Sequence, residues 1–356
     1  MSVKIAVDSS KFARYDSSKL IKLMEKICVK MGLSESDASI VAGMLNVNDL
    51  RGIDTHGIRM LPGYCRRVIA GGLNFKAKIT VEKDTPLMAL VDGDFGMGHL
   101  IGHKAMSMAI EKAKTSGMGF VWAKHSNHFG AAGSFAMMAQ AQGLVGITLT
   151  NVNAKLPPTG GITPGFGNNP WSIAFPVREG QIPVVIDMAL SVVANSNIVL
   201  ARELGMKIPK GWALTAEGED TDDPHLAKLL IPFGGYKGYA IGFAVEYFAG
   251  ILSGSSIGRE VSDFTITAKP HDCGHMFAAI DPFGIIGKDE YNQRLDGFIE
   301  SLRTSKLAPG AERVFVPGEM EYESLLERQK NGIPLSDKVI ADVNAICEEI
   351  GLAKEL

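Results

Sequence analysis

The stretch NDLRGIDTHGIRML, residues 48–61, places two aspartates and two arginines around His56, with a glycine on either side of it. A histidine titrates near neutral pH and can give or take a proton during a reaction, and an arginine can hold a carboxylate through two parallel hydrogen bonds. These residue types could therefore transfer a proton to an anionic substrate. Taken alone, the same composition is more typical of a polar surface turn, so its meaning depends on the rest of the chain.

His125, Asn127 and His128 form a second polar group, directly after an apolar segment that predicts a strand. Small residues then begin a predicted helix, and ligands of α/β sheets bind at such strand ends. We therefore expect His128 to contact a ligand. Two histidines three positions apart can instead bind a metal, but the local sequence supplies no third ligand. We expect no metal site, and a metal-dependent hydrolase or lyase built on the scattered histidines is the alternative function.

A long segment rich in glycine and proline occupies residues 150–176. A loop of this length in a compact domain is usually functional or mobile. Asn151, Asn153, Asn168 and Asn169 offer neutral hydrogen-bond donors and acceptors, which suit the ribose, amide or phosphate of a cofactor. A solvated lid without a specific ligand is the alternative interpretation.

Two further positions combine a charged side chain with a predicted helix start. Asp187 ends an apolar strand-like segment, where a carboxylate either caps the next helix or orients a catalytic histidine. Lys237 follows two glycines in FGGYKGY, and helix N-terminal amides beside a lysine form an anion site. A simple helix-start turn remains the alternative at Lys237.

Gly96, Gly98 and Gly102 give a GxGxxxG pattern between a predicted strand and a predicted helix. The dinucleotide-binding fingerprint, GxGxxG, has one residue fewer between its last two glycines. It is also followed, at the end of the next strand, by an acidic residue that binds the ribose. Here that strand ends in Lys124 and His125. We therefore interpret the glycines as a structural turn and not as an ordinary Rossmann site.

The elements that position these residues alternate between strands and helices. Predicted helices at 99–115, 131–142, 191–205, 238–253 and 289–304 lie between strand-like segments, which favours an α/β sheet with helices packed on it. The first 75 residues are mostly helical, with Ser34 as a cap, and Ser336 caps a final helix that we expect to pack on them. We expect the apolar segment 238–254 to be a buried helix, because it is too short to span a bilayer.

Composition excludes several classes of protein. The net charge of −3 provides no basic field for nucleic acid or a membrane surface. The four cysteines contain no CxxC pair, and two of them lie in apolar helical patterns that indicate small core residues, which fits a reducing compartment. The opening sequence MSVKIAVDSSKF has no signal-peptide character, so we expect a cytoplasmic protein.

Nine segments in order resemble the malate/L-lactate (sulfolactate-like) dehydrogenase family, which includes ureidoglycolate dehydrogenase. They are DLRGIDTHG, SNHFGAAG, TPGFGNNPWSIAFP, VVIDMA, IPKGWAL, TDDP, GGYKGY, FAAIDP and VPGEMEYESLLERQKNGIPL. The resemblance implies a three-layer α/β/α fold with a mixed sheet that is not an ordinary Rossmann fold. It also implies a helical part in which residues 1–80 pack with 318–356, and an α/β core for cofactor binding and dimerisation at 81–317.

The resemblance further implies an oxidoreductase that moves a hydride between NAD or NADP and a small 2-hydroxy or 2-oxo acid. His56 would be the general acid and base, beside Thr55, with Asp187 completing a relay and His128 as a second active-site histidine. The substrate residues would be Arg51, Tyr64 and Asn151. The cofactor residues would be Asn168, Asn169, Ile186, Asp187, Met188, Lys237, Gly238, Pro317, Gly318 and Glu319.

The sequence departs from the family pattern at three places. Met60 stands where the family usually has an arginine, and Leu190 and residues 195–197 replace a Thr/Ser and a Gly-Lys pair. The departures motivate one more hypothesis, a non-catalytic protein that has kept the fold. The resemblance implies a homodimer with the active site near the subunit contact.

Overall fold

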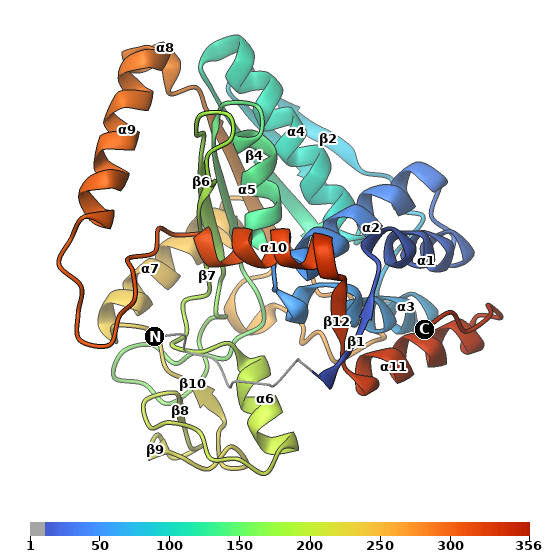
Figure 1. Ribbon diagram of the computed structural model, residues 1–356. Helices are drawn as coiled ribbons and strands as arrows, with labels where there is room; N and C mark the ends of the chain where they lie inside the picture. Colours follow the sequence, from blue (N-terminus) through green and yellow to red (C-terminus); the bar gives the residue numbers. More distant parts are fainter. Residues whose placement is uncertain (1–10) are drawn as a thin grey trace.

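The structure is a computed structural model that describes residues 11–356, so most of the opening segment MSVKIAVDSSKF lies outside the described residues. Its centre is a seven-stranded sheet with the strand order β2-β3-β4-β11-β5-β6-β7 (Figure 1). The strands are β2 (Thr80–Asp84), β3 (Met88–Asp92), β4 (Met118–Ser126), β5 (Val145–Thr150), β6 (Trp171–Phe175), β7 (Val184–Met188) and β11 (Cys273–Ile280).

The sheet is mixed, because β3 and β4 are parallel while its other neighbouring strands are antiparallel. An ordinary Rossmann sheet is mostly parallel. The expected mixed, non-Rossmann α/β fold is therefore confirmed. The sequence did not indicate β2, which lies at the edge of the sheet and has only exposed residues.

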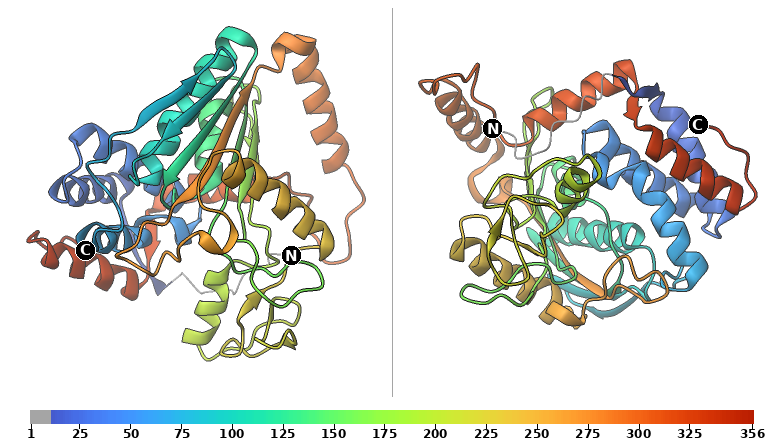
Figure 2. Two further views of the ribbon diagram at one scale, coloured as in Figure 1. Left: turned by 180° about the vertical axis from the view of Figure 1, so that it is seen from behind. Right: turned by 90° about the horizontal axis from the view of Figure 1, so that it is seen from below.

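Helices cover both faces of the sheet, as the three-layer prediction requires. The helices α4 (Gly98–Ser116) and α5 (Ala132–Gln140) lie together on one face (Figure 1). The helix α7 (Tyr236–Glu246) and the π-helical turn η4 (Tyr247–Ile251) lie on the other face (Figure 2). Glycines allow this close packing: a Cβ on Gly146 would lie 2.1 Å from the carbonyl oxygen of Ala136, in α5.

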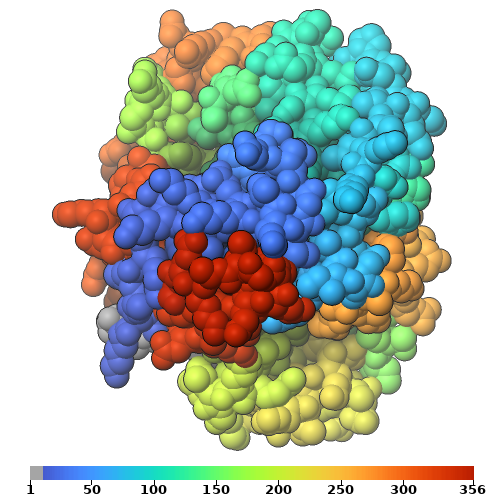
Figure 3. Space-filling model, turned by 90° about the vertical axis from the view of Figure 1, so that its right-hand side faces the viewer, coloured from blue at the N-terminus to red at the C-terminus, as the bar shows by residue number. Residues whose placement is uncertain are grey.

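The N-terminal helices of the described chain share a core with its C-terminal helix. The helices are α1 (Ser17–Lys30), α2 (Glu35–Leu50), α3 (Leu61–Ala70), α10 (Glu319–Asn331) and α11 (Asp337–Glu349). One buried cluster contains Leu20, Leu45, Val343 and Ile346, and Figure 3 shows the C-terminal segment in red against the N-terminal segments in blue. The short strands β1 (Ala13–Tyr15) and β12 (Ile333–Leu335) pair beside it. The boundaries of two separate units at residues 80 and 317 stay a prediction.

Helix starts follow the predicted caps. The Ser34 hydroxyl accepts the amide of Asp37 at 3.1 Å, and the Ser336 hydroxyl accepts the amide of Val339 at 3.4 Å. The helix predicted at 191–205 begins later, as α6 (Asn195–Glu203). The first residues of that range are extended instead, because Ser191 forms a β-bridge with Pro232.

The remaining elements lie at the edges of the sheet. A small sheet of β8 (Ala213–Leu214), β9 (Asp220–Thr221) and β10 (Leu229–Leu230) lies near α6, and α8 (Phe283–Ile286) leads into α9 (Lys288–Arg303). Helix α9 stands away from the sheet in Figure 1, and the Tyr291 hydroxyl ties it to the carbonyl of Pro176 at 3.1 Å.

The prediction that segment 238–254 is a buried helix is wrong. Gly238, Gly242 and Val245 are buried, but Phe243 is 61% exposed, and Tyr247 and other apolar side chains of this segment are also exposed. One side of the helix packs on the protein through glycines, and residues 11–356 leave the opposite apolar side exposed. Within residues 11–356, no helix is both long and apolar enough to cross a bilayer.

Candidate active site

His56 lies in a short 3-10 turn, η2 (Asp54–His56), that follows α2. The Thr55 hydroxyl is 2.8 Å from its Nδ1, and the Asn48 side chain donates to its carbonyl oxygen at 3.2 Å. Ser134 in α5 donates to Asn48 at 2.8 Å, which links the turn to the sheet-covering helices. The ring is half-buried, and its Nε2 forms no hydrogen bond within the described chain.

His128 follows β4 and stacks on His56, with ring centroids 5.5 Å apart and planes inclined by 21°. Its Nδ1 is 2.7 Å from the Tyr64 hydroxyl, and Tyr64 is buried in α3. Gly98 begins α4 directly beneath this segment, since a Cβ there would lie 2.2 Å from the Asn127 carbonyl oxygen. The GxGxxxG segment is thus a structural turn that supports His128, as predicted.

Burial keeps both imidazoles uncharged at neutral pH. Desolvation lowers the pKa of His56 to about 4. The pKa of His128 is held well below its ordinary value, first by desolvation and then by the positive charge that His56 and other histidines would carry. An anion bound beside either ring would oppose this shift and raise the pKa of that imidazole.

Asp187 ends β7 and accepts the backbone amide of Gly133 at 3.0 Å. Burial raises the pKa of this carboxyl to about 6, while the Gly133 amide and the charge of Arg51 act to lower it. No hydrogen bond joins Asp187 to His56 within the described chain; the Nδ1 of His56 faces Thr55 instead. The relay from Asp187 to His56 stays a prediction; the partner of the Asp187 carboxylate is the Gly133 amide, and Arg51 acts on it electrostatically.

Arg51 caps the end of α2 and is only 4% exposed. Burial lowers its pKa, and the negative charges of Glu321 and Asp187 oppose that shift. Among residues 11–356 no carboxylate lies within 4.0 Å of its guanidinium, and the group has no hydrogen bond. A buried guanidinium without a carboxylate partner among the described residues can bind the carboxylate of a substrate.

The side chains of Asn151 and Asn169 are committed to the protein itself. Asn151 donates to Glu246 at 2.9 Å and accepts the amide of Gly274 at 2.8 Å. Asn169 donates to the other oxygen of Glu246 at 2.6 Å. These contacts tie the loop at 150–176 to α7. Their assignment to substrate and cofactor stays a prediction, to which their hydrogen bonds add no support.

The predicted cofactor residues gather around β7, α7 and the start of α10, and several are accessible. Met188 is 42% exposed at the end of β7. Lys237 is exposed in the first turn of α7, where helical amides have no helical acceptors. A lysine beside such amides fits a phosphate, and an exposed apolar side chain fits a flat ring. The residues present therefore fit a nicotinamide dinucleotide.

Other predicted cofactor residues make backbone contacts within the protein. The carbonyl of Ile186 accepts the hydroxyl of Ser172 at 2.6 Å, and that of Asn168 accepts the amide of Leu190 at 2.8 Å. The buried Gly238 admits no side chain, because a Cβ would lie 2.2 Å from the carbonyl oxygen of Phe233.

The start of α10 is fixed against β7. The carbonyl of Pro317 accepts the amide of Val185 at 3.0 Å, and a Cβ on Gly318 would lie 2.9 Å from the same nitrogen. The Glu319 carboxylate is buried and accepts the amide of Val316 at 2.9 Å. This carboxylate is therefore an internal anchor for the loop.

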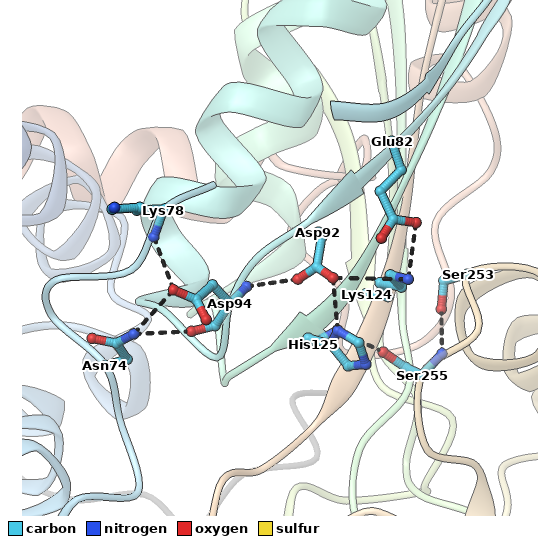
Figure 4. A network of polar contacts seen from close by, with 9 residues as sticks. All are labelled: Asn74, Lys78, Glu82, Asp92, Asp94, Lys124, His125, Ser253 and Ser255. Atoms are coloured by element: carbon cyan, nitrogen blue, oxygen red, sulfur yellow. Dashed lines mark hydrogen bonds and ion pairs between the residues drawn. The ribbon is translucent and has the colours of Figure 1, made fainter. Parts of the chain in front are cut away.

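The two histidines that could have bound a metal, His125 and His128, contact different partners. His125 lies 2.9 Å from Asp92 through its Nδ1, in a network with Lys124, Glu82 and Ser255 at the ends of β3 and β4 (Figure 4). His128 faces Tyr64 instead. No three His, Cys, Asp or Glu side chains among residues 11–356 are grouped to hold a metal ion. The four cysteines are buried and unpaired, as predicted.

Sequence reasoning missed several side chains around the histidines. His99 is fully buried against Tyr64, and neither of its ring nitrogens has a hydrogen-bond partner among residues 11–356. The ring of Phe264 contacts the rings of both Tyr64 and His128. The Arg67 guanidinium donates a hydrogen bond to the carbonyl oxygen of Phe264 at 2.8 Å. Nothing near these residues in the sequence indicates the contacts, because the partners are far apart along the chain.

The whole chain is similar to known dehydrogenases. A family model described as malate/L-lactate dehydrogenase matches residues 15–344. A malate dehydrogenase of Pyrococcus horikoshii is 36% identical over 351 residues, 96% of each chain. A ureidoglycolate dehydrogenase (NAD(+)) of Escherichia coli O157:H7 is 29% identical over 321 residues, 90% of this chain and 92% of that one.

The fold agrees with this similarity. The solved structure of sulfolactate dehydrogenase from Methanocaldococcus jannaschii has a TM-score of 0.90 and 34% sequence identity, and the alignment covers 96% of this chain and 98% of that one. With the paired histidines and the mixed sheet, these similarities place the chain in the malate/L-lactate dehydrogenase family of oxidoreductases.

Proposed function

We propose that this protein is an NAD(P)-dependent dehydrogenase of small 2-hydroxy acids, which also reduces the corresponding 2-oxo acids. The observation that carries the proposal is the pair of stacked imidazoles, His56 and His128, together with the buried guanidinium of Arg51 just before the His56 turn, which has no ion pair within residues 11–356. The relatives named for malate, sulfolactate and ureidoglycolate share a 2-hydroxy acid as substrate class, and one name specifies NAD(+).

In the reducing direction the substrate carboxylate binds the guanidinium of Arg51, which fixes the orientation of the 2-oxo group. The residues at the end of β7 and the start of α7 would hold a nicotinamide dinucleotide, which would supply the hydride for the carbonyl carbon. His56 gives its proton to the carbonyl oxygen, so the product is a hydroxyl group and a neutral imidazole. In the oxidising direction the neutral His56 takes the hydroxyl proton.

The two histidines have different roles in this proposal. His128 has its Nδ1 at 2.7 Å from the Tyr64 hydroxyl, and burial holds its pKa well below the ordinary value, whereas the Nε2 of His56 forms no hydrogen bond within the described chain. A ring that resists protonation is a poor proton donor but a stable hydrogen-bonding group. We therefore assign proton transfer to His56 and orientation of the substrate oxygen to His128.

A metal-dependent hydrolase or lyase is not favoured. Such a site usually needs three ligands, and the described histidines are directed to Asp92, Tyr64 and other separate partners. A non-catalytic protein is likewise not favoured, because the histidine pair and the cofactor-fitting residues of β7 and α7 are retained.

The test is a panel of 2-oxo acids and cyclic imines with NADH and NADPH, followed by absorbance of the reduced cofactor. We expect oxidation of at least one cofactor with a 2-oxo acid, and quenching or enhancement of cofactor fluorescence on binding. If neither cofactor binds, the dehydrogenase proposal is wrong. Turnover that survives only with an added divalent metal, and without a nicotinamide, would support the hydrolase or lyase instead.

We also propose a cytoplasmic homodimer whose contact includes the uncovered apolar side of α7 and η4. Phe243 is 61% exposed, and Tyr247 and Phe248 are 43% and 41% exposed. Contiguous apolar surface of this kind marks an interaction site. Because the same helix carries Lys237, the subunit contact would lie near the cofactor residues.

We predict that Phe243→Glu converts a dimer into a monomer in size-exclusion chromatography with light scattering. The added carboxylate would be desolvated in the contact. The matched control is Ile285→Glu on α8, where an exposed apolar residue is replaced away from α7. A monomeric wild-type protein, or a dimer that survives Phe243→Glu, would exclude this contact.

A further inference from the structure

Helix α10 lies beside the end of α2 (Figure 1), and its Arg328 reaches Asp54 across a separation of 274 residues in sequence. Glu321, Ser324 and Arg328 are spaced by three and four residues, so they share one side of the helix. Each of them meets a different residue of segment 49–54. Glu321 acts electrostatically on Arg51, and the Ser324 hydroxyl lies 2.8 Å from the place of a Cβ on Gly52.

Arg328 makes the most extensive of these contacts. Its buried guanidinium binds both carboxylate oxygens of Asp54, one of them at 3.2 Å, and donates to the carbonyl of Asp49 at 2.5 Å. Bidentate pairs between arginine and a carboxylate fix orientation as well as distance. Asp54 is the first residue of the turn that ends in His56. Arg328 therefore holds the N-terminal side of the histidine turn.

Asp49 holds the other side of the same turn. Its buried carboxylate accepts the amide of Ile58 at 2.8 Å. The carboxylate also lies directly on Gly57, where a Cβ would be 1.7 Å from its Oδ1, so no larger residue fits there. Thus the residues immediately before and after Thr55–His56 are both fixed, and Arg328 contacts Asp49 as well as Asp54.

The other end of α10 is attached to the cofactor side of the molecule. Pro317 accepts the amide of Val185 in β7, and Glu319 forms ion pairs with Arg303 and Arg313 at 3.4 and 3.9 Å. One continuous helix of 13 residues thus connects the β7 edge with the turn of His56. A helix transmits position along its axis because its backbone hydrogen bonds keep it rigid.

From these contacts we propose that Arg328 is a positioning residue of the active site. Through Asp54 and Asp49, it fixes the position of His56 relative to the end of β7. The inference rests on the proposed proton transfer by His56. Arg328 itself touches neither substrate nor cofactor. Its loss should misplace the proton donor, while the residues around β7 and α7 keep their arrangement.

The test compares Arg328→Met and Arg328→Lys with Glu327→Gln as the matched control. Glu327 lies on the same helix and pairs with Arg14 at 2.9 Å in an exposed ion pair. A displacement of about 1 Å at a catalytic group lowers turnover by about a hundredfold. We expect this loss in kcat for Arg328→Met, a smaller loss for Arg328→Lys, which cannot bind bidentately, and none for Glu327→Gln. The Kd for the reduced cofactor should not change.

Asp54→Asn serves as the second variant if Arg328→Met does not fold, because it weakens the same pair and leaves Arg328 in place. A readout independent of activity is the imidazole signal of His56 in NMR, assigned through His56→Gln. We expect that signal to shift in Asp54→Asn and in Arg328→Lys, and to stay in Glu327→Gln.

The outcomes separate this inference from the proposed function. If the wild-type protein turns over no 2-oxo acid, the proposed function fails, and the NMR shift alone then tests the contact. If the wild-type protein is active and kcat is unchanged in folded Arg328→Met or Asp54→Asn, the positioning role is wrong. A loss that appears only as weaker cofactor binding would also overturn it.

Discussion

Replacing His56 with glutamine is expected to lower kcat in both directions by about a thousandfold, within the usual range for removing a general acid and base. Glutamine keeps hydrogen-bonding capacity but cannot transfer a proton at neutral pH. The ring belongs to η2, whereas the proposed cofactor residues belong to β7, α7 and the start of α10, so the Kd for the reduced cofactor should stay within about twofold by fluorescence titration. Single-turnover absorbance would locate the loss in the chemical step.

The matched control is His128→Gln, which changes the stacked partner in the same way. We expect a smaller fall in kcat and a larger rise in KM, because His128 orients the substrate oxygen in the proposed mechanism. A greater loss of kcat in His128→Gln than in His56→Gln would reverse the two assignments. Wild-type rates in His56→Gln would exclude proton transfer by that residue.

The pH dependence follows from the low pKa of His56, about 4 in the free protein. Reduction needs the protonated ring, so kcat/KM for the 2-oxo acid should fall about tenfold for each pH unit between pH 5 and 8. Oxidation needs the neutral ring, which is already present over this range, so kcat/KM for the hydroxy acid should be nearly constant. Initial rates in both directions check the signs, and His56→Gln should remove the slope for reduction.

The sequence predicted the parts of the structure that depend on local patterns. Ser34 and Ser336 cap their helices because a hydroxyl next to free amides is a local arrangement. The mixed sheet and the proximity of His56 and His128 were inferred from resemblance, since periodicity contains no information about strand order. The exposed side of α7 was not predictable, because apolar composition does not distinguish contact with the core from contact with a partner.

The side-chain contacts of the site were less predictable for a physical reason. Arg328 reaches Asp54 across a separation of 274 residues, and the Tyr64 hydroxyl reaches His128 across 64. Such pairs form only after the elements that carry the two residues have packed, so neither residue carries a local signal. In the same way, Asn151 has the polar groups of a ligand-binding residue, but its side-chain amide donates a hydrogen bond to Glu246 in α7.

Replacing Arg51 with methionine is expected to lower kcat/KM for the 2-oxo acid by about a thousandfold. Methionine fills a comparable volume but cannot bind a carboxylate, and removing one partner of a buried charge pair costs about 2–5 kcal/mol. Because Arg51 has no ion pair of its own within the described chain, the lost interaction is with the substrate. Asp187 and Glu321 would then face the substrate anion with less positive charge nearby, which adds repulsion.

Three measurements separate substrate binding from a general defect. The matched control is Arg59→Met, which removes an exposed arginine from the same segment and should leave kcat/KM within about twofold. Arg51→Lys should recover only part of the loss, since an ammonium group cannot form the two parallel hydrogen bonds. Added guanidinium ion should partly restore the rate of Arg51→Met. If Arg51→Met instead keeps its KM for the 2-oxo acid and loses only thermal stability, the guanidinium supports Asp187 and does not bind the substrate, and the acid end of the substrate must be bound elsewhere.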